Sequence, residues 1–204
     1  RSDPGHDHRQ LIERLLTVNA RSIELTEALL ALSRSDQRSF PLEPVDMSLV
    51  VDEAVETLLP LAERHGVDVQ VDADPAPTLG SHALLLQMAT NLVHNAIVHN
   101  LDEGGVVRVA AAVGPEHAVL TVENTGDVIP PQLVATLTEP FQRGPGRVRS
   151  SHAGVGLGLA IVRSVCRAHG GDLTLAPRPG GGLVATVRLP LAAEPAEVVA
   201  PRVE

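Results

Sequence analysis

Four polar residues in the middle of the chain recur at intervals of four positions. Gln87, Asn91, Asn95 and His99 would stack on one face of a helix, and no Pro or Gly interrupts residues 81–100. Most other positions of this segment are apolar. A buried carboxamide costs free energy unless its donors and acceptors find partners, so a polar group should lie against this stripe. The alternative is a partly exposed helix whose amides meet water.

A second candidate for chemistry is a glycine-rich loop. Gly154, Gly156 and Gly158 precede an expected helix, so backbone amides could approach a phosphate closely at its N-terminus. The dinucleotide-binding spacing would need a glycine in place of Leu159 and a strand before the loop. Residues 144–153 are instead rich in Gly, Arg and Ser, which indicates a mobile loop. The pattern suggests a nucleotide lid, and a tight structural turn is the alternative.

A third candidate stands at the end of an expected strand. Leu120, Val122 and Asn124 share one face of that strand, opposite Thr121 and Glu123. Asn124 is therefore expected on the apolar side, where its side-chain oxygen could accept a hydrogen bond from the amino group of a purine.

The composition excludes several kinds of site. All 16 basic residues are Arg, and a Walker-type phosphate loop, a protein-kinase ATP site and Schiff-base chemistry all need a lysine. The net charge of −9 argues against a nucleic-acid partner. With aromatics at 1%, the core must be aliphatic, and the single Cys166 is predicted to be a small core residue rather than a nucleophile. No apolar run reaches the roughly 18 residues of a membrane-spanning helix.

The N-terminal part predicts a long helix over residues 7–36. It has two adjacent apolar stripes with a seven-residue repeat, which favours a helix in a bundle whose partners come from a second copy or from upstream sequence. Because the chain starts without Met, we expect a piece of something longer. Residues 38–44 indicate an extended linker, and Asp46 or Ser48 could cap a helix through Arg64 that ends at Gly66.

The remaining elements alternate between strands and helices. A strand is expected at residues 67–72, the amide-striped helix to residue 100, a hairpin at 106–113 and 117–123, a short helix at 132–138, a helix after the glycine loop to Ala168, and a hairpin at 173–175 and 183–189. The tail from residue 192 is predicted to be disordered. Hairpins dominate, so we expect an α+β fold with the helices on one face of the sheet.

Together these segments resemble the catalytic ATP-binding domain of bacterial sensor histidine kinases, of the Bergerat-fold ATPase superfamily. Residues 91–100 look like the N box, 122–130 the G1 box, 139–143 the F box and 154–159 the G2 box, in the order that the family has. The first helix resembles the second helix of a dimerisation and histidine-phosphotransfer bundle. The resemblance implies a two-layer α/β sandwich with a mixed sheet, and domains at residues 1–40, 41–190 and 191–204, the last a disordered tail.

The resemblance also implies roles for individual residues. Asn95 would coordinate Mg²⁺, Asn91 would support the phosphates or the metal, and Arg143 would stabilise phosphate charge, with Arg147 and Arg149 as weaker candidates. The other residues expected at ATP or ADP are Asn124, Gly126, Phe141, Gly154, Gly156, Gly158 and Leu159.

The chain departs from the family pattern at four places. The base-reading residue is usually Asp and is Asn124 here, which loses the charge assistance of that hydrogen bond. Val128 replaces a glycine of the G1 box, and Val98 replaces a frequent basic residue. No phosphoacceptor histidine box is present, so this chain is expected to bind nucleotide without phosphorylating itself.

The predicted function is the ATP-binding part of a two-component sensor histidine kinase. The intact protein would pass the γ-phosphoryl group from Mg-ATP to an upstream histidine and then to an aspartate of a response-regulator receiver domain. It would be a homodimer through the first helix, in the cytoplasm, attached to the cytoplasmic membrane only through upstream segments. Two alternatives stay open: an anti-sigma-factor-type serine kinase, and a nucleotide-free dimerisation or interaction module.

Overall fold

The computed structural model describes residues 40–139 and 157–192. The predicted helix over residues 7–36, the loop at 144–153 and the tail after residue 192 lie outside these ranges. The elements are β1 (Glu43–Asp46), α2 (Met47–His65), β2 (Asp68–Ala73), β3 (Pro77–Gly80), α3 (His82–Val98), β4 (Val106–Val113), β5 (His117–Asn124), α4 (Pro131–Val134), α5 (Gly158–Ala168), β6 (Asp172–Pro177) and β7 (Leu183–Pro190). None of the helices in these ranges is long and apolar enough to span a membrane.

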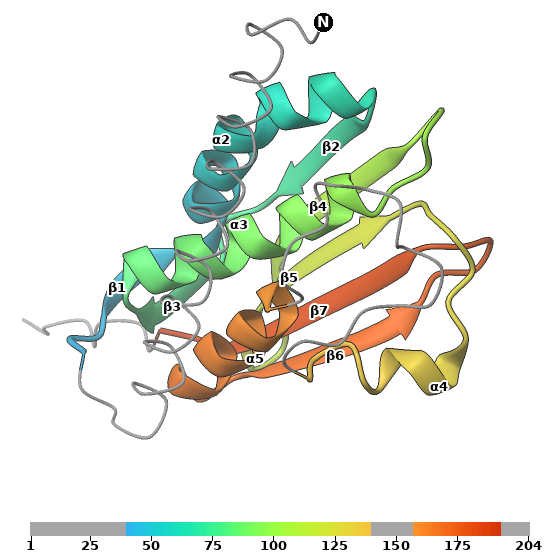
Figure 1. Cartoon of the computed structure of the whole chain (residues 1–204). Coiled ribbons are helices and arrows are strands. Elements are labelled where there is room, and N and C mark those ends of the chain that lie inside the picture. Colours follow the sequence, from blue (N-terminus) through green and yellow to red (C-terminus); the bar gives the residue numbers. More distant parts are fainter. Residues whose placement is uncertain (1–39, 140–156, 193–204) are drawn as a thin grey trace, which may run out of the picture.

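Five strands form the main sheet in the order β2-β4-β5-β7-β6. The β2–β4 pair is parallel and the other three pairs are antiparallel, so the sheet is mixed. Helices α2, α3 and α5 lie side by side over one face of it (Figure 1). The expected α+β fold, with two layers and helices on one face, is confirmed.

Local signals at its two ends account for α2. The Asp46 carboxylate accepts a hydrogen bond from the Ser48 amide at 3.0 Å and so caps the first turn. The same carboxylate oxygen accepts from the Ala76 amide at 2.9 Å, which fixes the helix start against the segment before β3. At the other end Gly66 has φ 63°, a left-handed conformation that glycine adopts without strain. The predicted helix is confirmed, with Asp46 as its cap.

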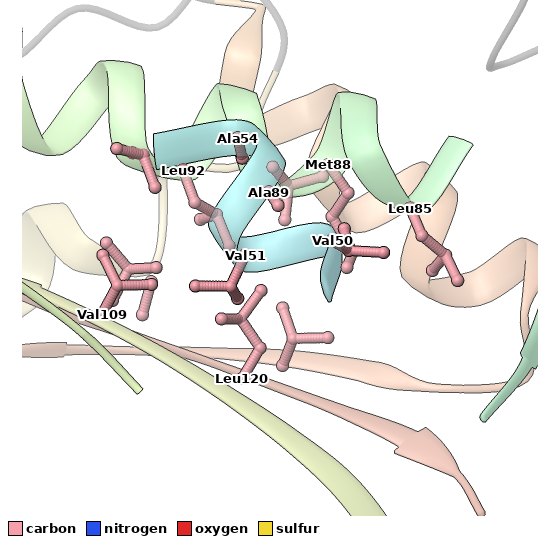
Figure 2. Close-up of a cluster of buried hydrophobic side chains, with 14 of the residues drawn as sticks. Val50, Val51, Ala54, Leu85, Met88, Ala89, Leu92, Val109 and Leu120 are labelled. Atoms are coloured by element: carbon pink, nitrogen blue, oxygen red, sulfur yellow. The ribbon is translucent and has the colours of Figure 1, made fainter. Parts of the chain in front are cut away.

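The core between the helices and the sheet is aliphatic, as predicted. Figure 2 shows side chains from α2 and α3 meeting those of the central strands β4 and β5. The labelled residues are Val50, Val51, Ala54, Leu85, Met88, Ala89, Leu92, Val109 and Leu120. Burial of each larger side chain stabilises the fold by about 1.5–3 kcal/mol. This packing holds α3, and therefore its polar stripe, in a fixed place over the sheet.

Cys166 belongs to the same core. It is fully buried on α5, and its thiol lies 3.5 Å from the Met88 sulfur. Burial, with a smaller contribution from the charge of Asp172, raises the pKa of this thiol to about 12. The thiolate, which is the nucleophilic form, is thereby suppressed. The prediction that Cys166 is a core residue is confirmed.

Two features differ from the sequence predictions. The segment expected as linker, residues 38–44, overlaps the first half of β1, which pairs antiparallel with β3 in a second, two-stranded sheet. Strand β3 itself was not predicted. The expected helix at residues 132–138 is reduced to the four residues of α4, followed by hydrogen-bonded turns up to Glu139. Both differences concern short elements with Pro residues, where local patterns are weak.

Candidate functional site

The polar stripe of α3 lies half-buried toward the N-terminus of α5. Asn91 donates from its side-chain nitrogen to the Gln87 carbonyl at 2.9 Å, a bond within the same helix. This bond uses one donor of the amide, and the side-chain oxygen, Oδ1, lies close to Gly158. Asn95 follows one turn later on the same face.

Gly158, the first residue of α5, lies directly on these two amides. A Cβ atom at this position would be 3.0 Å from Asn95 Nδ2 and 3.3 Å from Asn91 Oδ1. Contacts this short are uncommon for a Cβ atom, so a residue with a side chain would require the amides to shift by a few tenths of an ångström. The structure therefore brings the last glycine of the glycine loop to the two asparagines, with their side-chain oxygens gathered at a helix N-terminus.

Asn124 lies at the end of β5, and its side chain is held by the C-terminal end of α3. Its Nδ2 donates to the His99 carbonyl at 3.3 Å and to the Thr125 carbonyl at 2.7 Å, and the residue is 7% exposed. Gly126, two residues on, is packed against the same carbonyl: a Cβ there would lie 2.9 Å from His99 O. The end of α3 thus positions both residues.

A glycine turn supports this loop from the other side. Gly180, Gly181 and Gly182 connect β6 and β7 with φ values of 87°, 104° and 101°. The Gly182 amide donates to the Asp127 carbonyl at 2.9 Å, and a Cβ at Gly182 would collide with the Asn124 carbonyl oxygen. The sequence predicted a turn here but not its contact with the loop, because the two segments are far apart in the chain.

His169 connects the end of α5 with the start of α3. Its Nε2 accepts from the Ser81 amide at 3.1 Å, and its Nδ1 lies 2.8 Å from the Val165 carbonyl, so Nδ1 bears the proton of a neutral ring. Burial lowers the pKa of this side chain, against a smaller opposite effect of the Val165 carbonyl. The Phe40 ring lies against it, with 4.8 Å between ring centroids. The sequence pattern marked His169 only as a helix end.

The remaining predicted site residues are placed as follows. Leu159 is half-buried and packs against the hydrophobic core, and Val128 is 79% exposed on the loop after Gly126. Phe141, Arg143, Arg147, Arg149, Gly154 and Gly156 lie outside the described residues. Besides Leu159, the described part of the candidate site consists of Asn91 and Asn95 on α3, and of Asn124, Gly126 and Gly158 beside it.

Comparison with known proteins identifies the family to which this arrangement belongs. Residues 80–193 match the family model described as histidine kinase-, DNA gyrase B- and HSP90-like ATPase. The chain belongs to this ATPase family. It is also 45% identical over 192 residues, 93% of its length, to the sensor protein CutS of Streptomyces coelicolor. A further relative, 39% identical over 183 residues, is the probable sensor histidine kinase TcrY of Mycobacterium tuberculosis.

Solved structures of histidine kinases have the same fold. The mycobacterial sensor histidine kinase MprB is 32% identical, with a TM-score of 0.64 over 72% of this chain and 97% of that one. The histidine kinase AdeS of Acinetobacter baumannii, 19% identical, has a TM-score of 0.71 over 95% of this chain and 87% of that one. This ATPase-family chain thus corresponds to the ATP-binding part of a sensor histidine kinase. It spans about half the length, or less, of the curated relatives: 46% of CutS and 38% of TcrY.

Proposed function

We propose that this chain is the catalytic part of a two-component sensor histidine kinase and binds ATP or ADP with Mg²⁺ between α3 and α5. The supporting observation is that the described residues of the N, G1 and G2 boxes lie on α3 or against it. Gly158 lies on Asn91 and Asn95 in the middle of α3, and Asn124 and Gly126 lie against its C-terminal end. The phosphates would then lie near Gly158 and the base near Asn124.

The donor set beside Gly158 fits a hard cation. Two neutral side-chain oxygens, Asn91 Oδ1 and Asn95 Oδ1, lie within 3.4 Å of the place that a Gly158 Cβ would take. Oxygen ligands of this kind suit Mg²⁺, which retains several waters and binds few protein groups. When bound, Mg²⁺ would neutralise the charge of the phosphate oxygens. Arg143 is proposed as a further source of positive charge.

The roles of the intact protein follow from the relatives named as sensor proteins. We propose that residues 1–40 form part of a dimerisation bundle, 41–190 the ATP-binding domain and 191–204 a tail. The γ-phosphoryl group would pass to a histidine upstream of Arg1 and then to an aspartate of a response-regulator receiver domain. The whole would be a homodimer with its ATP-binding part in the cytoplasm, attached to the cytoplasmic membrane through upstream segments.

Calorimetric titration of ADP and ATP into this chain tests nucleotide binding. We expect saturable binding with Mg²⁺ and weaker binding without it. Asn95→Ala should weaken Mg-nucleotide binding by at least about tenfold, because a bond to a charged group contributes roughly 1.5–3 kcal/mol. Gln70→Ala removes an exposed carboxamide from β2, so its affinity should equal that of the parent chain. Absence of heat with either nucleotide, from a folded protein, would contradict the kinase proposal and favour an interaction module.

Phosphoryl transfer needs the intact protein. With labelled ATP we expect acid-labile phosphate on histidine, and its transfer to a purified receiver domain. Label on serine of a separate protein would instead favour an anti-sigma-factor-type kinase.

A further inference from the structure

Asn100, the residue after the last member of the polar stripe, uses both the nitrogen and the oxygen of its side-chain amide in hydrogen bonds. Nδ2 donates to the Ala96 carbonyl at 3.0 Å and to the Val106 carbonyl at 3.1 Å. Oδ1 accepts from the Leu101 amide at 2.9 Å and from the Thr125 hydroxyl at 2.5 Å. One side chain therefore connects the end of α3, the start of β4 and the loop after β5. We call Asn100, Thr125 and their partners the Asn100–Thr125 cluster.

The hydroxyl of Thr125 completes this cluster. It accepts from the Val106 amide at 2.8 Å while it donates to Asn100. The Thr125 amide also donates to the Val106 carbonyl at 3.0 Å. The position of the Thr125 backbone is therefore fixed relative to β4 and to the end of α3.

The two carbonyls that hold Asn124 belong to this fixed region. One is the Thr125 carbonyl, and the other belongs to His99, the neighbour of Asn100. Both accept from Nδ2, so the opposite orientation of the amide would place its oxygen against two carbonyl oxygens. The orientation of the Asn124 amide thus depends on where the cluster places these carbonyls.

The oxygen of the Asn124 amide is the end that remains for a ligand. Oδ1 accepts no hydrogen bond from the described residues. Every buried side-chain nitrogen or oxygen atom among those residues has a hydrogen-bond partner, so Oδ1 is not one of the buried atoms and is in contact with solvent. An amide oxygen accepts hydrogen bonds and cannot donate them. In this orientation it pairs with a purine amino group and opposes a purine carbonyl.

We propose that Thr125 and Asn100 are positioning residues that hold the Asn124 amide with its oxygen toward the base, and that they thereby set the preference for a 6-amino over a 6-oxo purine. The inference rests on the proposed nucleotide site. Neither residue needs to touch the nucleotide, because each acts through the carbonyls that orient Asn124. Loss of the Thr125 hydroxyl leaves the Val106 amide without its side-chain acceptor and removes one of the two hydrogen bonds that Asn100 Oδ1 accepts. The loop can then shift and the Asn124 amide can turn.

The test compares the dissociation constants of ADP and inosine diphosphate, which differ at the 6-position of the base. For the parent chain we expect a preference for ADP of about tenfold or more, since one hydrogen bond is gained and one oxygen–oxygen contact avoided. Thr125→Val has the same shape without the hydroxyl, and should reduce the preference to within about threefold. Thr125→Ser retains the hydroxyl and should retain most of the preference.

The ratio of the two constants separates positioning from a general structural role. If Thr125→Val weakens both nucleotides equally and leaves the ratio unchanged, the proposal is wrong. If the parent chain binds neither nucleotide, it is the proposed function that fails. The exchange rate of the side-chain amide protons of Asn124 is a further test that uses the parent chain alone and needs no variant. They should exchange with solvent much more slowly than those of the exposed Gln70 amide, and equal rates would overturn the proposal.

Discussion

Replacing Asn124 by aspartate would restore the residue that the histidine-kinase family usually has at this position, yet we expect it to destabilise this domain. The side-chain nitrogen of Asn124 donates two hydrogen bonds, at 2.7 Å and 3.3 Å, in a place where the residue is 7% exposed. A carboxylate would put an oxygen against the same two carbonyls. The variant therefore loses both donors and gains an unfavourable charge.

The magnitude follows from these contacts. Leaving a buried acceptor without its partner costs about 1–3 kcal/mol, and the bond at 3.3 Å is the weaker of the two, so we expect a loss of about 2–4 kcal/mol in the free energy of unfolding at pH 7.5. Burial and the carbonyl dipoles should raise the pKa of the new carboxyl above that in the unfolded chain. The folded state then retains its proton to higher pH than the unfolded state, so the deficit should be smaller at pH 5 than at pH 7.5.

Urea unfolding without nucleotide, followed by circular dichroism at both pH values, measures this difference. Asn124→Leu is the matched control, because it removes the same hydrogen bonds without adding a charge, and its deficit should not change with pH. An Asn124→Asp variant that is as stable as the parent chain at pH 7.5, or whose deficit is the same at pH 5, would refute the orientation of the amide described above.

Two further changes test other contacts of the site. Gly182→Ala should lower the free energy of unfolding by at least about 2 kcal/mol more than Gly180→Ala and weaken ADP binding about tenfold. Both positions have positive φ, but of the two only a Cβ at Gly182 collides with the Asn124 carbonyl. Denaturation measures the stability and calorimetry the binding, and equal effects of the two variants would contradict the packing. Burial lowers the pKa of His169, so the unfolded state binds a proton first as the pH falls below about 6.5, and stability is lost from there down to the folded pKa. His169→Gln should flatten the fall in stability between pH 7.5 and 5.5, and an unchanged profile would argue against a neutral, buried ring.

The parts of the fold with local signals could be predicted from the sequence. The cap at Asp46 and the left-handed Gly66 mark the ends of α2, and Gly114 marks the turn between β4 and β5. The repeat of Asn91 and Asn95 at helical spacing indicated the polar stripe, and the glycine pattern indicated a loop whose backbone could approach a phosphate closely. In each case the information lies within a few residues of the element concerned.

What could not be predicted depends on residues distant in the sequence. Thr125 and Asn100 are 25 positions apart, and neither has a pattern that indicates the other as its partner. The same holds for His169 and Ser81, 88 positions apart. Strand β3 has four residues, begins with Pro and finds its partner strand upstream of α2, so that only the folded chain reveals it. Pairings of this kind are set by the packing of the helices on the sheet.

The short strand β3 has a consequence for how the domain is attached to other parts of a protein. Along one edge β3 pairs with β1, where the chain enters the domain. On its other side Thr78 pairs with Leu191, and the Ala192 amide donates to the Pro77 carbonyl, where the chain leaves the domain. Entry and exit therefore lie on the same strand. A domain whose two ends lie close together is suited to circular permutation and to transfer between proteins as one unit. New flanking sequence would then contact the domain only near β3 and leave its core unchanged.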